Sequence, residues 1–382
     1  MHKPIDATRY PSVNALALGI CAEAPAIAAP YETASEHLHD ELQRLNVRLA
    51  RLADDSYGSR DEDWRGAHEV VRLIDEHVAA RLDASRRAQI DLPLPRLARL
   101  FQLTRFETEA LLVALAPEID RRYERLYGYL QDDITRKRPT AGLLLDLLCR
   151  GEEERLAACA AFDSPAPPVR HRLARLIEAV AGDDVPLLAR ELIVDDRIVG
   201  LLLGRSGLDA RLDGVARLIA PGESSPLGAG GEFREVVDRI RAVAQRDSGE
   251  ATGPAGTLVH LYGSVLSVTR EAAEKVCREL SLPLLAVDVD RLLAGPPPFA
   301  EAISLLAREA LLSPAALCFE HFDSLIDDPL KHVTLLRPLL DAVRSVRLTF
   351  VLGTWPWTPP AATVGQSFVG ARLMPPDQVV RR

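Results

Sequence analysis

Leucines recur along residues 38–52 at alternating spacings of four and three, which is the period of a helix with one apolar face. The stretch DEDWRGAHEVVRLIDEHVAARLD follows, and its acidic start suits a helix N-terminus. The leucine repeat is too short to indicate a coiled coil. The pattern therefore predicts two helices that pack against each other.

Residues 92–149 hold short apolar segments separated by turn residues. Thr104 and Glu107 have the spacing of a capping box, which predicts that a helix begins there. Short helices joined by tight turns are typical of helix-turn-helix and winged-helix modules. Further on, VPLLARELIV predicts a strand or wing, and DDRIVGLLLG predicts a helix that is closed by Gly204.

From residue 256 onward, short apolar runs alternate with helical patterns. Near-continuous apolar strands separated by helices imply a parallel sheet that is covered on both faces. Before them, PGESSPLGAGG is rich in Gly, Pro and Ser and lacks periodicity, so it predicts a domain boundary. The expected organisation is a flexible tail at 1–30, a helical domain at 31–220, a linker at 221–231 and an α/β domain at 232–382.

Composition and charge exclude several classes of protein. The net charge of -9 argues against the basic surface of a nucleic-acid binder. The five cysteines form no CxxC pair and no Cys/His cluster, so we expect no disulfide framework, no zinc site and no haem. No apolar run approaches the ~18 residues of a membrane span, and Glu23 interrupts the apolar N-terminal stretch. A cytoplasmic protein with reduced cysteines is the expectation.

The stretch LYGSVLSVTREAAEKV has the outline of a phosphate-binding loop. Such a loop reads G-x-x-x-x-G-K-[ST]; its backbone N–H groups and lysine hold phosphates, and its Ser or Thr holds Mg²⁺. Here Gly263 and Thr269 stand in order, but Ser267 replaces the second glycine and Val268 the lysine. A charged hydrogen bond to phosphate is worth about 1.5 to 3 kcal/mol, so the missing lysine is the larger loss. Arg270 is a candidate substitute, although the residues favour a strand–loop–helix retained for packing.

Two later strands end in further candidates. Glu320, at the end of AALCFE, is a candidate Mg²⁺ ligand together with Thr269, provided that nucleotide binds. His321 follows it as a weak stand-in for a catalytic glutamate, because His can act as a base. Thr354, after LTFVLG, is a candidate γ-phosphate sensor, although the residue taken alone favours an ordinary strand end. None of these residues is a firm catalytic assignment.

The segments GSVLSVTR, LPLLAVDVDRLL, ALCFEHFDSL and FVLGTWPW follow one another as in an AAA+ ATPase core, which residues 256–382 resemble. The preceding FQLTRFETEALLVALAPEIDRRYERLYGYLQDDITRKRPT resembles the N-terminal region of a bacterial AAA+ group, some of whose members accompany contractile injection systems. The resemblance implies a mixed fold, with a helical winged-helix-like domain before a P-loop α/β core. It also implies a degenerate first AAA+ module, here with degenerate Walker A and Walker B motifs, and hydrolysis in a second, downstream module. The sequence ends at ARLMPPDQVVRR, about where the helical lid would begin, so we expect a core truncated before the lid, in either a fragment of a longer protein or a shortened relative.

The leading hypothesis is therefore an AAA+ family protein whose core is a structural or assembly module, with protein partners and self-association in an AAA+ assembly. A second hypothesis keeps ATP and Mg²⁺ as cofactors of an unconventional ATPase that uses Glu320, Thr269 and Arg270. A third is a winged-helix DNA-binding regulator that acts through residues 92–149.

The basic run TRKRP, residues 135–139, is what raises the possibility of DNA binding. The helix expected after it, AGLLLDLLC, is nearly all apolar and lacks the polar side chains that read base edges. Acidic residues also accompany the arginines before the run, and they would weaken phosphate contacts. Nucleic acid is therefore not the expected partner, and no membrane association is expected either.

Overall fold

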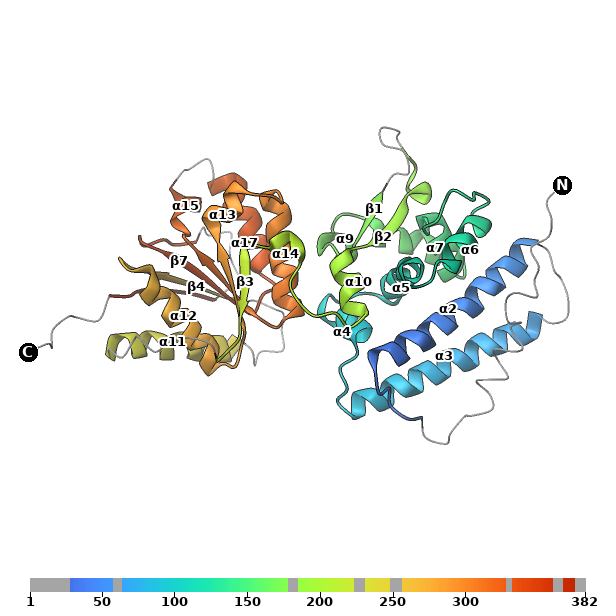
Figure 1. Cartoon of the computed structure of the whole chain (residues 1–382), viewed down its shortest axis with the longest axis horizontal. Helices are drawn as coiled ribbons and strands as arrows, with labels where there is room; N and C mark the ends of the chain where they lie inside the picture. The colour runs from blue at the N-terminus through green and yellow to red at the C-terminus, as the bar shows by residue number, and fades with distance from the viewer. Residues whose placement is uncertain are drawn as a thin grey trace, which may run out of the picture. The chain divides into compact units, whose positions relative to one another are not determined.

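The computed structural model describes residues 28–57, 64–177, 185–222, 231–247, 256–327, 332–359 and 367–374. The chain divides into two compact units, residues 1–206 and residues 207–382 (Figure 1). Most of the predicted tail at 1–30 lies outside the described residues. No helix in the described ranges combines the length and the apolar character that crossing a bilayer requires.

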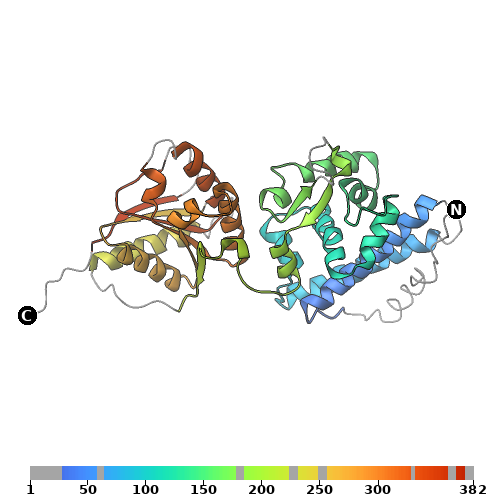
Figure 2. The same ribbon diagram turned by 45° about the horizontal axis from the view of Figure 1, so that its top comes forward.

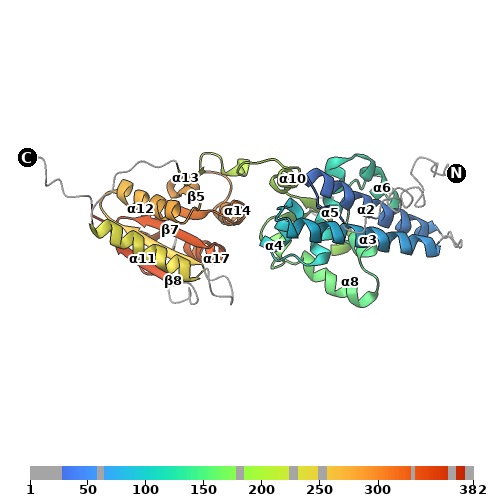
Figure 3. The ribbon, with the colours of Figure 1, turned by 90° about the horizontal axis from the view of Figure 1, so that it is seen from below.

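Two long helices, α2 (Ala34–Tyr57) and α3 (Trp64–Arg87), open the first unit. They lie side by side, as Figures 1 and 3 both show. The leucine repeat on α2 faces inward, with Leu45 and Leu49 buried. The predicted pair of packed helices is confirmed.

Short helices fill the middle of the first unit, and Thr104 begins one of them as predicted. Its side chain accepts a hydrogen bond from the Glu107 backbone, while its own N–H donates to Glu107 Oε2 at 2.7 Å. This reciprocal pair satisfies two donors that a helix start leaves open. The helices are α4 (Pro93–Leu100), α5 (Arg105–Ile119), α6 (Arg122–Leu130), α7 (Ala141–Leu148), α8 (Glu152–Ala158) and α9 (Pro167–Arg170).

An antiparallel hairpin of β1 (Ala174–Ile177) and β2 (Glu191–Val194) follows the short helices. Thr140, just before α7, adds an isolated antiparallel bridge to Glu191. The strand expected within VPLLARELIV is therefore confirmed as β2. The unit closes with α10 (Asp196–Leu202), after which Gly204 takes a positive φ of 78°, as a helix-ending glycine does.

A six-stranded sheet forms the second unit, in the order β3-β5-β6-β7-β4-β8. β3 is antiparallel to β5, and every other neighbouring pair is parallel. β4 lies between β7 and β8, so its carboxyl end is flanked on both sides. The strands are β3 (Ala216–Ile219), β4 (Thr257–Tyr262), β5 (Leu284–Asp288), β6 (Ala316–Glu320), β7 (Leu348–Gly353) and β8 (Ser367–Arg372).

Helices cover both faces of this sheet (Figure 2), which confirms the predicted parallel α/β arrangement. One buried cluster joins α14 and α17 to side chains such as Phe319, and the other joins α11 and α12 to side chains such as Cys318. The alternation along β6 follows from the two-residue period of a strand. The helices are α11 (Gly231–Asp247), α12 (Leu266–Glu279), α13 (Val289–Ala294), α14 (Phe299–Leu312), α15 (Asp323–Ile326) and α17 (Arg337–Val343).

The division between the units lies earlier than the predicted linker at residues 221–231. Ala216–Ile219 pairs with β5, and Asp209 forms a buried ion pair with Arg308 of α14, with Oδ2 and Nη2 2.5 Å apart. Both contacts tie residues 207–222 to the α/β unit. The boundary prediction was wrong because β3 is a short, half-exposed edge strand without an apolar run that could mark it.

Candidate functional site

The predicted site residues gather at the carboxyl ends of β4, β5, β6 and β7. In open parallel sheets, ligands bind in the crevice beyond these strand ends. Gly263 follows β4, Glu320 ends β6, and Thr354 follows β7. The sheet therefore brings together segments that are far apart in the sequence.

The connection from β4 to α12 is short. β4 ends at Tyr262 and α12 begins at Leu266, so only Gly263, Ser264 and Val265 lie between them. The run from Gly263 to Thr269 is one residue shorter than the phosphate-loop motif. None of these described residues has a positive φ. The alternating backbone that makes an anion-binding nest is therefore missing from this connection.

Packing accounts for the glycine at position 263. A Cβ at this position would lie 2.2 Å from the carbonyl oxygen of Leu373, far inside any van der Waals contact. The Leu373 N–H donates to Tyr262 O at 2.8 Å, and the Gly263 N–H donates to Gly353 O at 3.1 Å. Gly263 thus lets the segment after β8 approach β4, and its own N–H is already engaged.

The other positions of the loop motif also have roles inside the fold. Thr269 is fully buried, and its hydroxyl donates to the carbonyl oxygen of Leu266 at 2.9 Å. Val268, at the lysine position, packs against the buried cluster beneath α11 and α12. Ser267 is exposed on the first turn of α12. A hydroxyl facing back along its own helix and an apolar side chain facing the core present no charge to a phosphate.

Arg270 and Glu320 form an ion pair with each other, between Nη2 and Oε2. Glu320 is 5% exposed, and its Oε1 has no hydrogen-bond partner among the described residues. If Arg270 turned to a phosphate, it would leave a buried carboxylate without its counter-charge. That loss costs about 3 to 5 kcal/mol for a fully buried pair, and less here because the Arg270 side chain is 33% exposed.

His321 points toward two aspartates. Its Nδ1 lies 3.6 Å from Asp288 Oδ1 and 3.8 Å from Asp290 Oδ2. Its backbone takes a φ of 58°, in the left-handed region that a histidine seldom occupies. Sequence reasoning missed both aspartates, because PLLAVDVD was considered only as a strand.

Thr354 is held through its backbone. Its N–H donates to Asp323 Oδ2 at 2.7 Å, and its residue is exposed. Beneath it, a Cβ at Gly353 would lie 2.7 Å from Asp323 Oδ1 and 3.4 Å from His260 Nε2. His260 is fully buried, and burial lowers its pKa. The close approach of Asp323 Oδ1 therefore favours a glycine directly before Thr354, whereas the distance to His260 is an ordinary contact.

The predicted DNA-binding region shows charges that are matched internally. The basic residues Arg136, Lys137 and Arg138 lie near Asp133, Glu124 and Glu118 respectively, at 3.2, 3.8 and 3.6 Å. The helix that follows, α7, is largely buried, as its apolar sequence predicted. In α8, the first turn consists of three exposed glutamates at positions 152–154. This helix precedes the β1–β2 hairpin and would repel a phosphate backbone.

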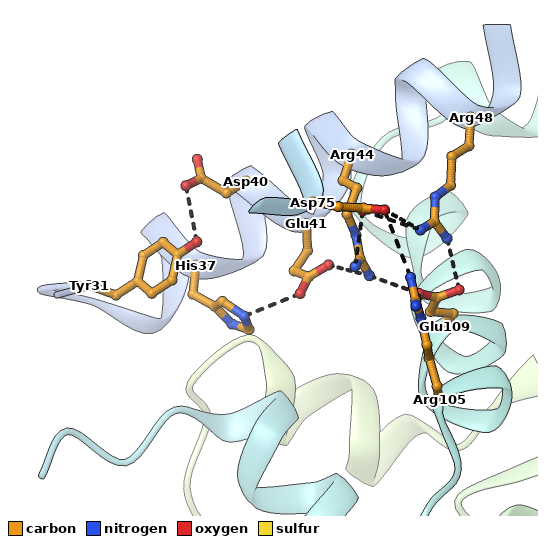
Figure 4. A network of polar contacts seen from close by, with 9 residues as sticks. All are labelled: Tyr31, His37, Asp40, Glu41, Arg44, Arg48, Asp75, Arg105 and Glu109. Carbon is orange, nitrogen blue, oxygen red and sulfur yellow. Dashed lines mark hydrogen bonds and ion pairs between the residues drawn. The ribbon is translucent and has the colours of Figure 1, made fainter. Parts of the chain in front are cut away.

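A network of arginines and carboxylates joins α2, α3 and α5 (Figure 4). We call it the arginine clasp; it consists of Arg44, Arg48, Asp75, Arg105 and Glu109. Glu109 lies 2.8 Å from Arg48, 3.0 Å from Arg105 and 3.4 Å from Arg44. Burial acts to raise the pKa of Glu109, but the charges of Arg48 and Arg44 outweigh it, so this pKa lies below its usual value. The clasp holds the long helix pair to the short helices.

The comparisons with known proteins bear on both units. No curated protein sequence matches the chain. A solved structure described as "Structure of C. elegans PCH-2" has 13% identity and a TM-score of 0.30, over 44% of this chain and 52% of its own length. The chain thus spans about half of that structure.

A family model described as "Winged helix domain, variant" matches residues 22–216. The match takes in the α2–α3 pair, the arginine clasp, the short helices and the β1–β2 hairpin. It covers just over half of the 382 residues. The chain therefore belongs to the winged helix domain, variant, family.

Proposed function

We propose that this chain is a component of a protein assembly, in which the second unit is an AAA+-type core that acts as a scaffold and does not hydrolyse ATP. The observation that carries the proposal is the ion pair between Arg270 and Glu320. Arg270 would have to neutralise phosphates, and Glu320 would have to hold Mg²⁺. Each instead neutralises the other.

The connection from β4 to α12 supports the same function. Its N–H at Gly263 is bonded to Gly353, and the Thr269 hydroxyl is bonded to Leu266. Gly263, Val268 and Thr269 thus contribute to packing or to helix geometry. Because the sheet is stabilised by apolar burial on both faces, the fold does not depend on phosphate ligands.

The test is a calorimetric titration of the whole chain with Mg-ATP. The proposal expects no binding up to about 1 mM nucleotide, which corresponds to an affinity weaker than about -4.1 kcal/mol. An ATP turnover that disappears in a Thr269→Ala variant would contradict the proposal. The rival ATPase predicts, in addition, that Arg270→Ala lowers turnover.

For the first unit, the proposed role is contact with protein. The glutamates that open α8 disfavour DNA, while Leu156 on the same helix is 70% exposed and offers an apolar contact. A titration with duplex DNA at low and moderate salt is the direct check. Affinity that falls steeply with salt would show phosphate contacts and overturn this assignment.

The wider setting is also a proposal. The resemblance of residues 101–140 to proteins that accompany contractile injection systems supports a cytoplasmic, multi-subunit assembly with self-association. Light scattering coupled to size-exclusion chromatography measures the mass of the chain across a concentration series. A mass that stays at one chain, about 41.8 kDa, at every concentration contradicts self-association.

A further inference from the structure

Three side chains converge at the carboxyl edge of β5 and β6. Asp288 ends β5, Asp290 lies in the short helix after it, and His321 follows β6. One ligand atom from each residue lies within 4.8 Å of the other two. The two distances from His321 Nδ1, 3.6 and 3.8 Å, are too long for hydrogen bonds.

These distances equal or slightly exceed those between ligands that share an ion. Two donor atoms bound at about 2.0 to 2.2 Å from one metal, at angles near 90 to 110°, lie roughly 3 to 3.6 Å apart. Two carboxylates and one imidazole also meet the charge requirement of a divalent cation. Arg291 Nε lies 3.5 Å from Asp288 Oδ2, but that arginine side chain is 68% exposed. Its Nη1 also donates to Gly214 O at 3.0 Å, so metal binding would leave this arginine anchored beside Asp288 or would break that exposed hydrogen bond.

A second observation comes from Glu320, which is not part of the trio. Its Cα is the register partner of Asp288 across the parallel β5–β6 pair, so both side chains start on the same face of the sheet. Glu320 is 95% buried, and its Oε1 lacks a hydrogen-bond partner within the described ranges. A buried carboxylate oxygen without a partner costs free energy, and Glu320 thus adds an unpartnered acceptor oxygen on the strand next to Asp288.

Hydrogen bonds from neighbouring residues also orient the two aspartates. Asp290 Oδ1 accepts a hydrogen bond from Ser324 Oγ at 2.5 Å, which leaves Oδ2 toward His321. Asp288 Oδ1 accepts the Arg291 backbone N–H at 3.2 Å and keeps further lone pairs. Hydrogen bonds of this kind fix the orientation of ligating carboxylates.

We propose that Asp288, Asp290 and His321 form a binding site for a divalent transition-metal ion of the Mn²⁺ and Zn²⁺ class. An imidazole nitrogen with carboxylate oxygens suits these ions, whereas Mg²⁺ and Ca²⁺ prefer oxygen ligands alone. The site lies on β5 and β6 and does not require nucleotide. A bound ion ties the segment after β5 to the segment after β6.

The test uses Mn²⁺ alone, without nucleotide, because Mn²⁺ prefers oxygen ligands to sulfur ligands such as Cys149 and Cys159. Binding to the purified chain is followed by loss of the electron paramagnetic resonance signal of the free ion. We expect saturable binding at one site, weakened at least tenfold in His321→Asn. Asparagine tolerates a positive φ, so this variant keeps the backbone and loses the imidazole. His39→Asn, which removes an exposed histidine from α2, is the matched control and should bind as the unsubstituted chain does.

A second variant separates ligand loss from a change in folding. Asp290→Asn keeps the shape of the side chain and an oxygen for Ser324, and it should also weaken Mn²⁺ binding at least tenfold. Mn²⁺ should raise the unfolding temperature of the unsubstituted chain and leave that of His321→Asn unchanged. Absence of saturable binding up to about 1 mM, unchanged affinity in both variants, or equal displacement by Mg²⁺ would each overturn the proposal.

Discussion

The arginine clasp of the first unit and the carboxyl edge of the second unit are both polar clusters, but they differ in how their charges are matched. In the clasp, Asp75 and Glu109 each lie between 2.8 and 3.8 Å from all three arginines. At the carboxyl edge of the sheet, buried Glu320 of β6 pairs with the partly exposed Arg270 of α12, and Asp288, Asp290 and His321 lie at or just after the ends of β5 and β6. A cluster whose charges satisfy one another serves packing, whereas one with carboxylate oxygens to spare can take a ligand.

Of the substitutions that test this comparison, removal of Glu109 should cause the largest loss of stability. Glu109→Ala removes a buried carboxylate from three arginines and leaves them Asp75, with Glu41 also beside Arg44, so we expect the first unit to lose about 3 kcal/mol of unfolding free energy. Urea denaturation of the whole chain, followed by circular dichroism, measures it. Glu76→Ala removes a carboxylate from an exposed pair with Arg72 and should cost no more than about 0.5 kcal/mol. Equal losses in the two variants would mean that the arginine clasp stabilises the unit no more than an exposed ion pair does.

Arg270→Met should have a smaller effect than Glu109→Ala. It keeps the apolar stem and leaves Glu320 without its cation, which costs about 1 to 3 kcal/mol. Thermal unfolding of the chain gives the loss. Arg337→Met, at an 81% exposed position, is the control and should change little. If the proposed metal site is correct, saturating Mn²⁺ should recover part of the loss in Arg270→Met.

The stability of the first unit should also depend on pH through His171, with a smaller effect than the substitutions above. Burial lowers the pKa of His171 to about 4, from 6.5. The unfolded chain therefore binds more protons than the folded chain between these values, so stability rises with pH from about 4 to 6.5. The slope cannot exceed about 1.4 kcal/mol per pH unit for one group. Urea midpoints at pH 4.5 and 6.5 should differ less in His171→Gln; an unchanged difference would assign the slope to other groups.

Glu109 contributes to the pH dependence of stability in a lower pH range than His171 does. Its folded pKa lies below the usual value of 4.5, so its contribution is present above that value and is lost as the pH falls through the folded pKa. The arginines stay charged throughout. Measurements above about pH 4.5 therefore exclude Glu109 and report His171 together with His260, whose pKa burial also lowers, and a further loss below that pH belongs partly to the clasp.

Local patterns were enough to predict much of the fold. The leucine spacing predicted α2, the Thr104–Glu107 pair predicted the start of α5, and apolar runs predicted the parallel strands. The domain boundary was misplaced because β3 is four residues long and carries two exposed positions. Periodicity carries no signal for a strand of that kind.

The site could be predicted only in part. Arg270 and Glu320 were both singled out from their motif positions, but nothing in the sequence says that they pair with each other. Asp288 and His321 come together only because β5 and β6 are neighbours in register. Reasoning from cysteine and histidine spacing looked for metal ligands close in sequence, and it therefore predicted no zinc site. Long-range pairs of this kind depend on tertiary geometry.

The position of β4 has a consequence for how the second unit is made. Its register pairs Thr257 with Leu348 on one side and with Ser367 on the other. A chain leaving the ribosome thus displays an apolar strand with both edges unpaired until β7 emerges, and with one edge unpaired until β8 emerges. Such non-local pairing forms slowly, and an unpaired apolar edge favours association with other chains. Synthesis of this unit is therefore expected to depend on chaperones more than synthesis of the largely helical first unit.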